Sequence, residues 1–279
     1  MARLNSPVVA IDFGASNTDI VWRDRDTIRR WSQPSRGQPD EARVREVLAL
    51  GDVAPKDVSW IAVTGGNRER IPEAIDGRTV HRVDEVNSIG RGGLELAQVN
   101  RAIVTSAGSG TAVVNAGPEG AHHVTGSGVG GGTLVGLGRM LIDITDPREL
   151  DALARKGHHK ALNLTIGEIL GGAIGSLPPD TTAVNFGRVA REPITARPED
   201  VASALVNMVG QVIAVIAINA ARATQNPEIV VVGHMTDLPS IRDVLAQVGQ
   251  FYSAHIRIPE HGGYATAMGA LTETQRRIG

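Results

Sequence analysis

The sequence predicts an α/β fold with two similar halves, and three observations support this. Segments with the apolar runs of buried strands alternate with segments whose apolar residues recur at helical spacing. A pattern of strand, glycine turn, strand and strand occurs twice, near Gly14 and near Gly108. The chain has 279 residues, 42% of them apolar, which is enough for one large domain or two of moderate size. We expect the halves to be residues 1–99 and 100–279.

In the first half, apolar stretches bounded by turn residues predict the strands. These strands are expected at 7–13, 18–23, 27–31, 58–63 and 80–83. Asp40–Leu50 has valines and leucines at helical spacing, and Asp84–Gln98 has a helical pattern despite three glycines. A further helix is expected after the glycine pair Gly65-Gly66.

The second half repeats this alternation. Strands are expected at 101–106, 111–116, 121–125, 228–232 and 255–258. Helices are expected at 133–142, 146–156, 198–224, 237–248 and 262–274, with a polar loop before Asp180. Pro198–Thr224 has two acids in its first turn and is apolar nearly all round in its middle. Such a helix is central or lies in a subunit interface.

Composition excludes several classes of protein. The net charge of −2 and a pI near 6.5 do not indicate a nucleic acid or an anionic membrane as partner. Eight aromatic residues (3 Trp, 2 Tyr, 3 Phe) are too few for base-stacking platforms. The absence of cysteine excludes disulfides and cysteine-ligated metals and fits a cytoplasmic protein. The N-terminal apolar run is too short for a signal peptide, and Val212–Ile218 is too short for a membrane span.

The first glycine turn follows an acid. Asp12 stands near a strand end and is followed by the small residues Gly14, Ala15 and Ser16. A carboxylate there can hold Mg²⁺ through water, and small residues expose N–H groups to phosphate oxygens. Taken alone, the stretch also fits an ordinary hairpin turn.

A second turn of small residues follows the same pattern in the other half of the chain. Gly108, Ser109, Gly110 and Thr111 occupy the matching place in the second half, so two turns could hold one triphosphate from opposite sides. Gly233 ends a third strand at a junction suited to lie under an adenine ring. The three-part arrangement resembles the ATP fold of actin, sugar kinases and Hsp70.

The densest glycine cluster lies between Gly126 and Gly138, where seven of thirteen residues are glycine. Each glycine destabilises a helix or strand by about 0.5–1 kcal/mol, so the cluster needs a reason. One reason is a ligand close to the backbone, bound by free N–H groups at a helix start. The other is a tight turn that lets two elements pack closely.

Seven blocks together resemble the type II pantothenate kinases. They are VTGGN at 63–67, an acidic pair at 84–85, GSGT at 108–111, VTGSGVGGGTLVGLG at 124–138, TTAVNFGRV at 181–189, VVVGH at 230–234 and GGYATAMGAL at 262–271. The blocks span nearly the whole chain in family order, and GGGT-x-x-GLG and NFG are the most specific. The resemblance implies a two-lobed actin-like ATPase (ribonuclease H-like) fold, ATP and Mg²⁺ as cofactors, and a homodimer.

The resemblance also implies roles for single residues. Asp12 would organise Mg²⁺, and the two small-residue turns described above would bind phosphates. Gly131, Gly132 and Thr133 would border the nucleotide at a helix start. Glu85 matches the family's catalytic acid, which takes the proton from the substrate hydroxyl as that oxygen attacks phosphorus.

Two alternatives stay open at the acidic pair. An acid at the start of a helix is favoured by the helix dipole without any catalytic role, so Glu85 could be a solvated acid. Asp84 is adjacent, so the match to the family could also be displaced by one residue.

Three positions depart from the family pattern. Asp19 stands where a phosphate-binding Lys is expected, and it either contacts the metal or points away. Ala112 replaces a Ser in the second turn. His123 replaces the Arg that holds the pantothenate carboxylate, beside Thr125 and Gly126 in the expected substrate site. Arg offers a planar and always charged fork, which His does not, so His123 puts the substrate in question.

The sequence therefore predicts an ATP-dependent kinase that phosphorylates pantothenate in the first step of coenzyme A synthesis. Pantetheine, pantoate and other hydroxy acids are alternative acceptors. A catalytically weak nucleotide or acyl-CoA binding protein is a second class, and an ATP-driven activator without an iron–sulfur cluster is a third. A hydantoinase-type amidohydrolase shares the Gly14–Asp19 loop pattern but not the later blocks. His158-His159 reads as part of a solvated loop rather than a metal site, because adjacent side chains diverge and no third ligand is spaced nearby. His122-His123 is likewise not expected to be a metal pair.

Overall fold

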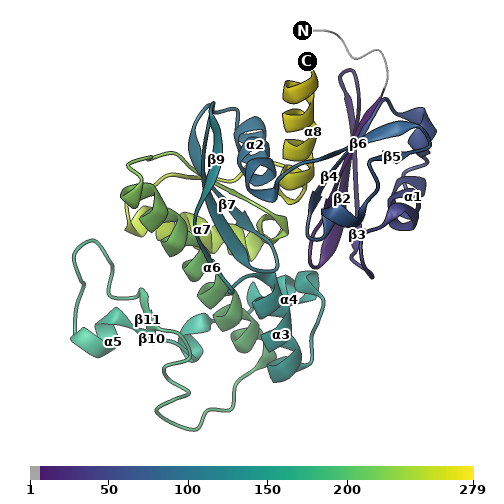
Figure 1. Cartoon of the computed structure of the whole chain (residues 1–279). Coiled ribbons are helices and arrows are strands. Elements are labelled where there is room, and N and C mark those ends of the chain that lie inside the picture. Colours follow the sequence, from purple (N-terminus) through teal and green to yellow (C-terminus); the bar gives the residue numbers. More distant parts are fainter. Residues whose placement is uncertain (1–6) are drawn as a thin grey trace.

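The computed structural model describes residues 7–279. The first six residues, which belong to the N-terminal segment considered above for a signal peptide, lie outside the described residues. Two β-sheets form the centres of two lobes, with helices packed on their faces (Figure 1). The first lobe contains β1 to β6, and the larger second lobe contains β7 to β9, β12 and β13.

The first sheet has the strand order β3-β2-β1-β4-β6-β5. Its strands are β1 (Val8–Phe13), β2 (Asn17–Asp24), β3 (Thr27–Pro34), β4 (Ile61–Gly65), β5 (Ala74–Ile75) and β6 (Arg78–Arg82). β1, β2 and β3 form an antiparallel meander, whereas β4 runs parallel to β1 and β6 runs parallel to β4. The apolar runs predicted for β1, β2 and β4 are mostly buried, whereas β3 is partly exposed along its length.

The second sheet repeats this topology. Its strands are β7 (Ala102–Ala107), β8 (Thr111–Gly117), β9 (Gly120–Ser127), β12 (Ile229–Val232) and β13 (Ile256–Arg257). The order β9-β8-β7-β12-β13 corresponds strand for strand to β3-β2-β1-β4-β6, with the same parallel and antiparallel pairings. The duplicated strand–turn–strand core predicted from the sequence is confirmed.

Eight α-helices are present among residues 7–279. They are α1 (Glu41–Ala49), α2 (Glu85–Ala97), α3 (Gly131–Ile142), α4 (Pro147–Ala154), α5 (Ile166–Leu170), α6 (Pro198–Ala223), α7 (Pro239–Phe251) and α8 (Ala265–Ile278). The helix expected after Gly65-Gly66 is wrong, because only the 3₁₀ turn η2 (Arg68–Arg70) forms there. Pro72 explains this, since a proline disfavours helical geometry at the residue before it.

The expected polar loop before Asp180 is also wrong in part. It contains the 3₁₀ turn η3 (His159–Ala161), the short helix α5 and the strand β10 (Leu164–Thr165), which pairs with β11 (Thr182–Val184). The sequence does carry a local signal for α5. Thr165 and Glu168 form a capping box, in which the Glu168 carboxylate accepts from the Thr165 amide at 2.8 Å.

A network of side-chain amides joins this small sheet to α6. The Asn163 carboxamide oxygen accepts from the Phe186 amide at 2.8 Å, and its nitrogen donates to Asn185 at 3.3 Å. Asn207 of α6 donates to the Asn185 side chain at 3.1 Å. Asn163 and Asn207 are buried, so this network satisfies polar groups that would otherwise be unpaired. Asn185 and Phe186 belong to the NFG block, so the network gives this block a structural role.

The longest helix, α6, is the central helix of the second lobe. It packs against α3, α4 and α7 and against the second sheet (Figure 1). Its length and mean hydropathy of 2.2 also match a membrane span, but 72% of its apolar window is buried inside the protein. It therefore has the setting of a core helix.

Helices α2 and α8 each pack against the sheet of the other half of the sequence. α2 precedes the second sheet in the chain and covers it through Ile89 and Leu94. α8, the last helix, covers the first sheet through Met268 and Leu271. The two helices also pack against each other between the lobes (Figure 1). The division of the chain at residue 100 stays a prediction. Each of these two helices packs on the sheet that lies on the other side of that division in the sequence.

Candidate functional site at the two glycine turns

The first turn connects β1 to β2. Gly14, Ala15 and Ser16 form it, and a Cβ added at Gly14 would lie 2.7 Å from the carbonyl oxygen of Asn17, so only glycine fits there. The Ser35 hydroxyl donates to the Gly14 carbonyl at 2.7 Å and fixes the turn from its outer side.

The second turn connects β7 to β8 and faces the first. The hydroxyls of Ser16 and Ser109 share a hydrogen bond of 2.7 Å, so the tips of the two turns meet across the lobes. The Gly108 amide donates to the Gly110 carbonyl at 3.0 Å, and the Thr111 hydroxyl donates to Val129 at 2.8 Å. The structure thus brings together the two small-residue turns that were predicted from separate halves of the chain.

The glycine cluster begins α3, which packs against the second turn. The amides of Gly131 and Gly132 donate to the carbonyls of Gly108 and Ser109 at 2.8 and 2.9 Å, so these two N–H groups are not free. A Cβ at Gly130 would lie 2.7 Å from the Ser109 carbonyl oxygen. The Thr133 hydroxyl donates to the Gly128 carbonyl. Of the two reasons considered for the cluster, close packing accounts for these contacts, and a nucleotide at Gly131, Gly132 and Thr133 stays a prediction.

The third junction lies at the end of β12. Gly233 has a φ of +97°, and a Cβ there would lie 2.4 Å from the Ala107 carbonyl oxygen. Its amide donates to the Gly262 carbonyl at 2.9 Å, which connects the junction to the segment before α8. The glycine is therefore required by its conformation and by the neighbouring strand.

Asp12 lies in a row of polar residues across the first sheet. It is directly opposite Asp19 on β2 and Thr64 on β4. Burial raises the pKa of Asp12 well above its ordinary value, and the charges of Asp19 and Glu85 add to the effect, against a smaller opposing effect of His234. The charges of Asp19 and Glu85 thus act on Asp12 near the C-terminal end of β1.

The two acids at the start of α2 have different positions. Asp84 is the N-cap residue, and its carboxylate accepts from the Asn87 amide at 3.0 Å. Glu85 is the first residue of the helix and is exposed, and its charge acts on Asp12. The structure therefore gives Asp84 the capping role and gives Glu85 none in the cap.

Asp19 has a partner that the sequence analysis did not foresee. Its carboxylate accepts from Nε2 of His234 at 2.9 Å, and Nδ1 of the same ring donates to Asp237 at 2.7 Å. Burial lowers the pKa of His234, but the hydrogen bonds to Asp19 and Asp237 outweigh it and raise this pKa to about 10. The ring is therefore a cation at neutral pH.

The three residues expected at the substrate lie on β9, but they do not share one face of the sheet. His123 pairs with Val114, and Gly126 pairs with Ala112, which place both on the face that α2 covers. Thr125 pairs with Val113, whose side chain packs on the opposite face. A register shift between Val113 and Val114 produces this arrangement.

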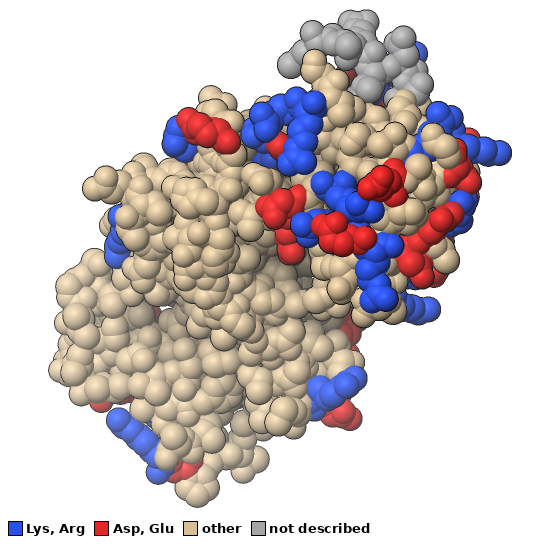
Figure 2. All heavy atoms as spheres, in the orientation of Figure 1, with Lys and Arg blue, Asp and Glu red and all other residues tan. Residues whose placement is uncertain are grey.

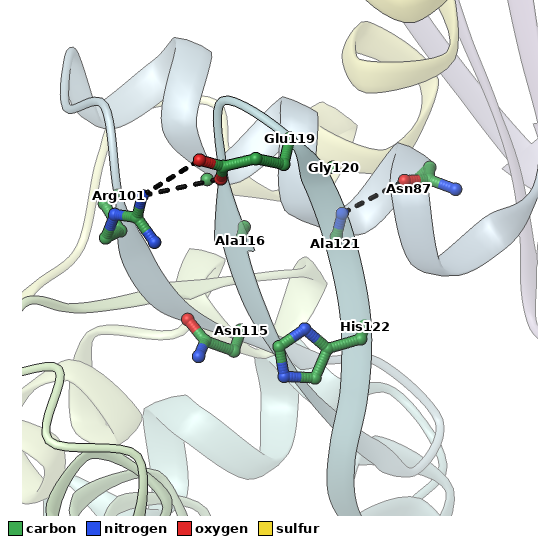
Figure 3. A pocket seen from close by; sticks show the side chains of 9 residues that line it. Asn87, Arg101, Asn115, Ala116, Glu119, Gly120, Ala121 and His122 are labelled. Carbon is green, nitrogen blue, oxygen red and sulfur yellow. Dashed lines mark hydrogen bonds and ion pairs between the residues drawn. The ribbon is translucent and has the colours of Figure 1, made fainter.

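A hollow of about 380 Å³ lies beside the end of the β8–β9 hairpin (Figure 3). Asn87, Arg101, Asn115, Glu119 and His122 contribute to its lining, and Arg101 forms an ion pair with Glu119 at 3.3 Å. The Asn87 side chain accepts from the Ala121 amide at 3.1 Å. Neither His123 nor any residue of the two turns lines this hollow.

The comparisons with known proteins agree with this geometry. The family model Fumble matches residues 95–273. The type II pantothenate kinase of Staphylococcus haemolyticus (strain JCSC1435) is 29% identical over 217 residues, covering 76% of this chain and 82% of that protein. The enzyme of the same name from Bacillus cereus (strain ATCC 14579) is 24% identical over 223 residues, covering 77% and 81%.

A solved structure shows the fold. The activator of the 2-hydroxyisocaproyl-CoA dehydratase from Clostridium difficile, with bound ADPNP, superposes with a TM-score of 0.66 at 16% identity and 98% coverage of each chain. The fold is thus the two-lobed actin-like ATPase fold with a duplicated core. Because the family model matches more than half of the residues, the chain belongs to the Fumble family, the type II pantothenate kinases.

Proposed function

We propose that this protein is an ATP-dependent kinase that phosphorylates the hydroxyl of pantothenate, the first step of coenzyme A synthesis. One observation carries the proposal: the two phosphate-type turns meet at the hydroxyls of Ser16 and Ser109, 2.7 Å apart, and the strand before the first turn carries Asp12, on which the charge of Glu85 acts. Phosphoryl transfer needs positioned phosphates, neutralised charge and one placed base. Membership of the family supports the same activity.

ATP would lie between the lobes. The backbone of the two turns would bind its phosphates, since small residues let oxygens approach the backbone. The N–H groups available for this exclude that of Gly108, which donates to the Gly110 carbonyl. The residues of the two turns are Gly14, Ala15, Ser16, Gly108, Ser109, Gly110 and Thr111. Gly233 would lie under the adenine ring, and Gly131, Gly132 and Thr133 would border the nucleotide.

Mg²⁺ would be held by Asp12 through water. The environment of Asp12 fits a hard cation. A positive charge beside the Asp12 carboxylate would stabilise its ionised form, which burial and the nearby carboxylates disfavour. Among the described residues no three His, Asp or Glu side chains converge on one point, so phosphate oxygens and water would complete the coordination. When bound, Mg²⁺ neutralises charge on the transferring phosphoryl group.

Glu85 is the proposed general base. Its carboxylate would accept the proton from the acceptor hydroxyl as the oxygen attacks the γ-phosphorus. Its exposure at the first turn of α2 leaves it open to a substrate, whereas the carboxylate of Asp84 is used by the helix cap. A correctly placed base of this kind contributes roughly 10²–10⁴-fold to the rate.

The acceptor would bind beside His123 and Gly126, with Thr125 contributing from the far face of β9 through the backbone. His123 in place of the family's Arg keeps pantetheine, pantoate and other hydroxy acids as alternative acceptors. A catalytically weak homologue that binds a nucleotide or acyl-CoA is the second class of function that this replacement favours.

We further propose a cytoplasmic homodimer. Large apolar side chains are exposed on α3 and on the segment around α5, among them Met140, Leu141, Leu170 and Ile174. Figure 2 shows that charged side chains gather over the first lobe, whereas the lower part of the second lobe has few in this view. An apolar and weakly charged surface of this kind is typical of a subunit interface. Light scattering after size-exclusion chromatography tests the dimer.

An ADP-release screen tests the proposed activity. Pantothenate, pantetheine, pantoate and simple hydroxy acids are offered with ATP and Mg²⁺, and the Glu85→Gln variant serves as the control for background hydrolysis. ADP release that depends on one acceptor and is lost in the variant supports the kinase. ATP binding, seen as a raised melting temperature, without turnover of any acceptor supports the weak homologue instead.

A further inference from the structure

A carboxylate stands at the position where the family's phosphate-binding Lys is expected. Asp19 lies on β2, three residues after Ser16 of the first turn, and only 5% of it is exposed. It stands directly opposite Asp12, and two carboxylates in that arrangement repel each other. A buried carboxylate requires a partner, and Asp19 has one in the other lobe.

That partner is His234, the residue after Gly233. Its Nε2 donates to Asp19 at 2.9 Å and its Nδ1 donates to Asp237 at 2.7 Å, so both ring nitrogens carry a proton. Only imidazolium can donate twice, which agrees with the raised pKa of the ring. The chain therefore places a cation between one carboxylate of each lobe.

The surroundings fix the ring in this position. The ring of Tyr264 stands at 73° to the imidazole, with centroids 5.8 Å apart. A Cβ added at Gly263 would lie 2.4 Å from Nδ1 of His234, so the Gly262–Tyr264 segment leaves no room for another position of the ring on that side. An ordered charge pair of this kind differs from an exposed ion pair, which contributes little.

The Asp19–His234–Asp237 group joins two parts of the proposed nucleotide site. Asp19 extends from the strand that follows the first phosphate turn, and His234 follows the third junction, where the adenine would lie. The Ser16–Ser109 hydrogen bond is a second link between the lobes. Neither the Asp19–His234 nor the Ser16–Ser109 hydrogen bond involves a residue of α2 or α8.

We propose that Asp19, His234 and Asp237 form a clasp that holds the lobes closed at the nucleotide site, with His234 as a positioning residue. The clasp sets the distance between the first phosphate turn and the Gly233 junction. One nucleotide can then bind with its phosphates at the turn and its base at the junction. The family's Lys at the Asp19 position would not supply this link, because a cation there would repel His234. This inference rests on the proposed function for its consequence, but the closure itself is measured without nucleotide.

The test uses the absence of cysteine from the chain. Ala49→Cys on α1 and Ala246→Cys on α7 place spin labels at exposed positions, one on each lobe. The distance between the labels is then measured by pulsed electron paramagnetic resonance in the nucleotide-free protein. We expect one narrow distribution in the parent, and a broader distribution at longer distance in His234→Gln and in Asp19→Asn.

Three variants make the test specific. His234→Lys keeps a cation between the two carboxylates and should keep the narrow distribution. Asp237→Asn changes only the more exposed partner and should broaden the distribution partly, which keeps the test readable if the other variants do not fold. Arg257→Gln breaks an ion pair of 2.7 Å to Glu228 within the second lobe and should change nothing. An unchanged distribution in folded His234→Gln and Asp19→Asn would overturn the clasp.

Kinetics separate the clasp from the kinase proposal. If only about a tenth of the His234→Gln molecules are closed, the KM for ATP should rise about tenfold while kcat changes less. A normal KM for ATP despite open lobes would refute the link to nucleotide binding. The parent could also phosphorylate none of the acceptors while the variants show the expected distance changes. That result would refute the kinase proposal and leave the clasp intact.

Discussion

Gly92 of α2 and Gly269 of α8 meet backbone to backbone where the two helices pack between the lobes. A Cβ added at Gly269 would lie 2.6 Å from the Gly92 amide nitrogen and 1.8 Å from the Ser88 carbonyl oxygen. A Cβ at Gly92 would in turn lie 1.8 Å from the Ala265 carbonyl oxygen. The glycines thus permit a helix contact that no larger residue allows.

Gly269→Ala should therefore destabilise the protein. The added methyl group meets backbone atoms that cannot rotate away, and overpacking of this kind costs about 1–3 kcal/mol. Thermal unfolding measures it as a fall of roughly 2–4 °C per kcal/mol. Gly136→Ala on α3 is the matched control, because nothing lies within 4 Å of its Cβ position, and it should be neutral or stabilising. Equal melting temperatures for both variants would contradict the close contact.

The helices themselves were predictable, but their partners were not. The pattern of Asp84–Gln98 predicted α2 despite its glycines, and the glycine turns predicted both strand pairs, because these signals lie within a few residues. The contact of Gly92 with Gly269 joins positions far apart in the chain, and only the packed structure defines it. The short strands β10 and β11 escaped prediction because buried amides such as Asn163, rather than an apolar pattern, hold them.

Glu85→Gln should abolish most of the turnover while ATP still binds. The amide keeps the size of the side chain and removes the proton acceptor, so kcat should fall roughly 10²–10⁴-fold. Asp84→Asn should retain activity, because asparagine is an equally good N-cap. Single-turnover phosphoryl transfer with ATP and the active acceptor measures both. If Asp84→Asn abolishes transfer and Glu85→Gln does not, the base is Asp84.

The stability that His234 contributes should depend on pH. Its pKa is about 10 in the folded protein and near the ordinary value of about 6.5 in the unfolded chain. The contribution is therefore fully present below pH ~6.5 and is lost as the pH rises towards 10. Tyr264 faces the same ring, and burial together with Asp19 raises its pKa, so it remains neutral over this range.

The measurement is the difference in melting temperature between the parent and His234→Gln. The difference should be largest between about pH 5 and 6.5 and should shrink steadily up to pH 10, because groups remote from His234 titrate alike in both proteins and cancel. A constant difference across this range would show that His234 is not held as a cation.

Loss of the Asn163 side chain should weaken the attachment of the β10–β11 sheet. Asn163→Leu leaves the Phe186 amide and the Asn185 side chain without this partner, and an unsatisfied buried group costs about 1–3 kcal/mol. Hydrogen exchange of the amides in residues 159–190 should accelerate more than exchange in the first sheet. Uniform acceleration in both regions would mean that the network stabilises the whole protein rather than this segment.

The candidate site was predictable in part. Asp12, the two turns and Gly233 came from local patterns, and the structure brings the two turns together at Ser16 and Ser109. The partner of Asp19 could not be found, because His234 is 215 positions away. The glycine cluster left two explanations open, and only the carbonyls of the second turn show that the first amides of α3 are already paired.

His123→Arg should improve the use of an acidic acceptor. His123 is exposed on β9, on the face covered by α2. The family resemblance implies an Arg at this position that holds the pantothenate carboxylate. A guanidinium offers two parallel hydrogen bonds to a carboxylate, which imidazole cannot, and charge-assisted bonds of this kind contribute about 1.5–3 kcal/mol. The KM for pantothenate should therefore fall by roughly tenfold or more in the variant, whereas the KM for pantetheine, which has no carboxylate, should not change.

His122→Arg is the matched control, because His122 pairs with Asn115 and points to the opposite face of β9. Equal effects on the two acceptors would place the carboxylate elsewhere, and no effect on either would point to a different acceptor altogether.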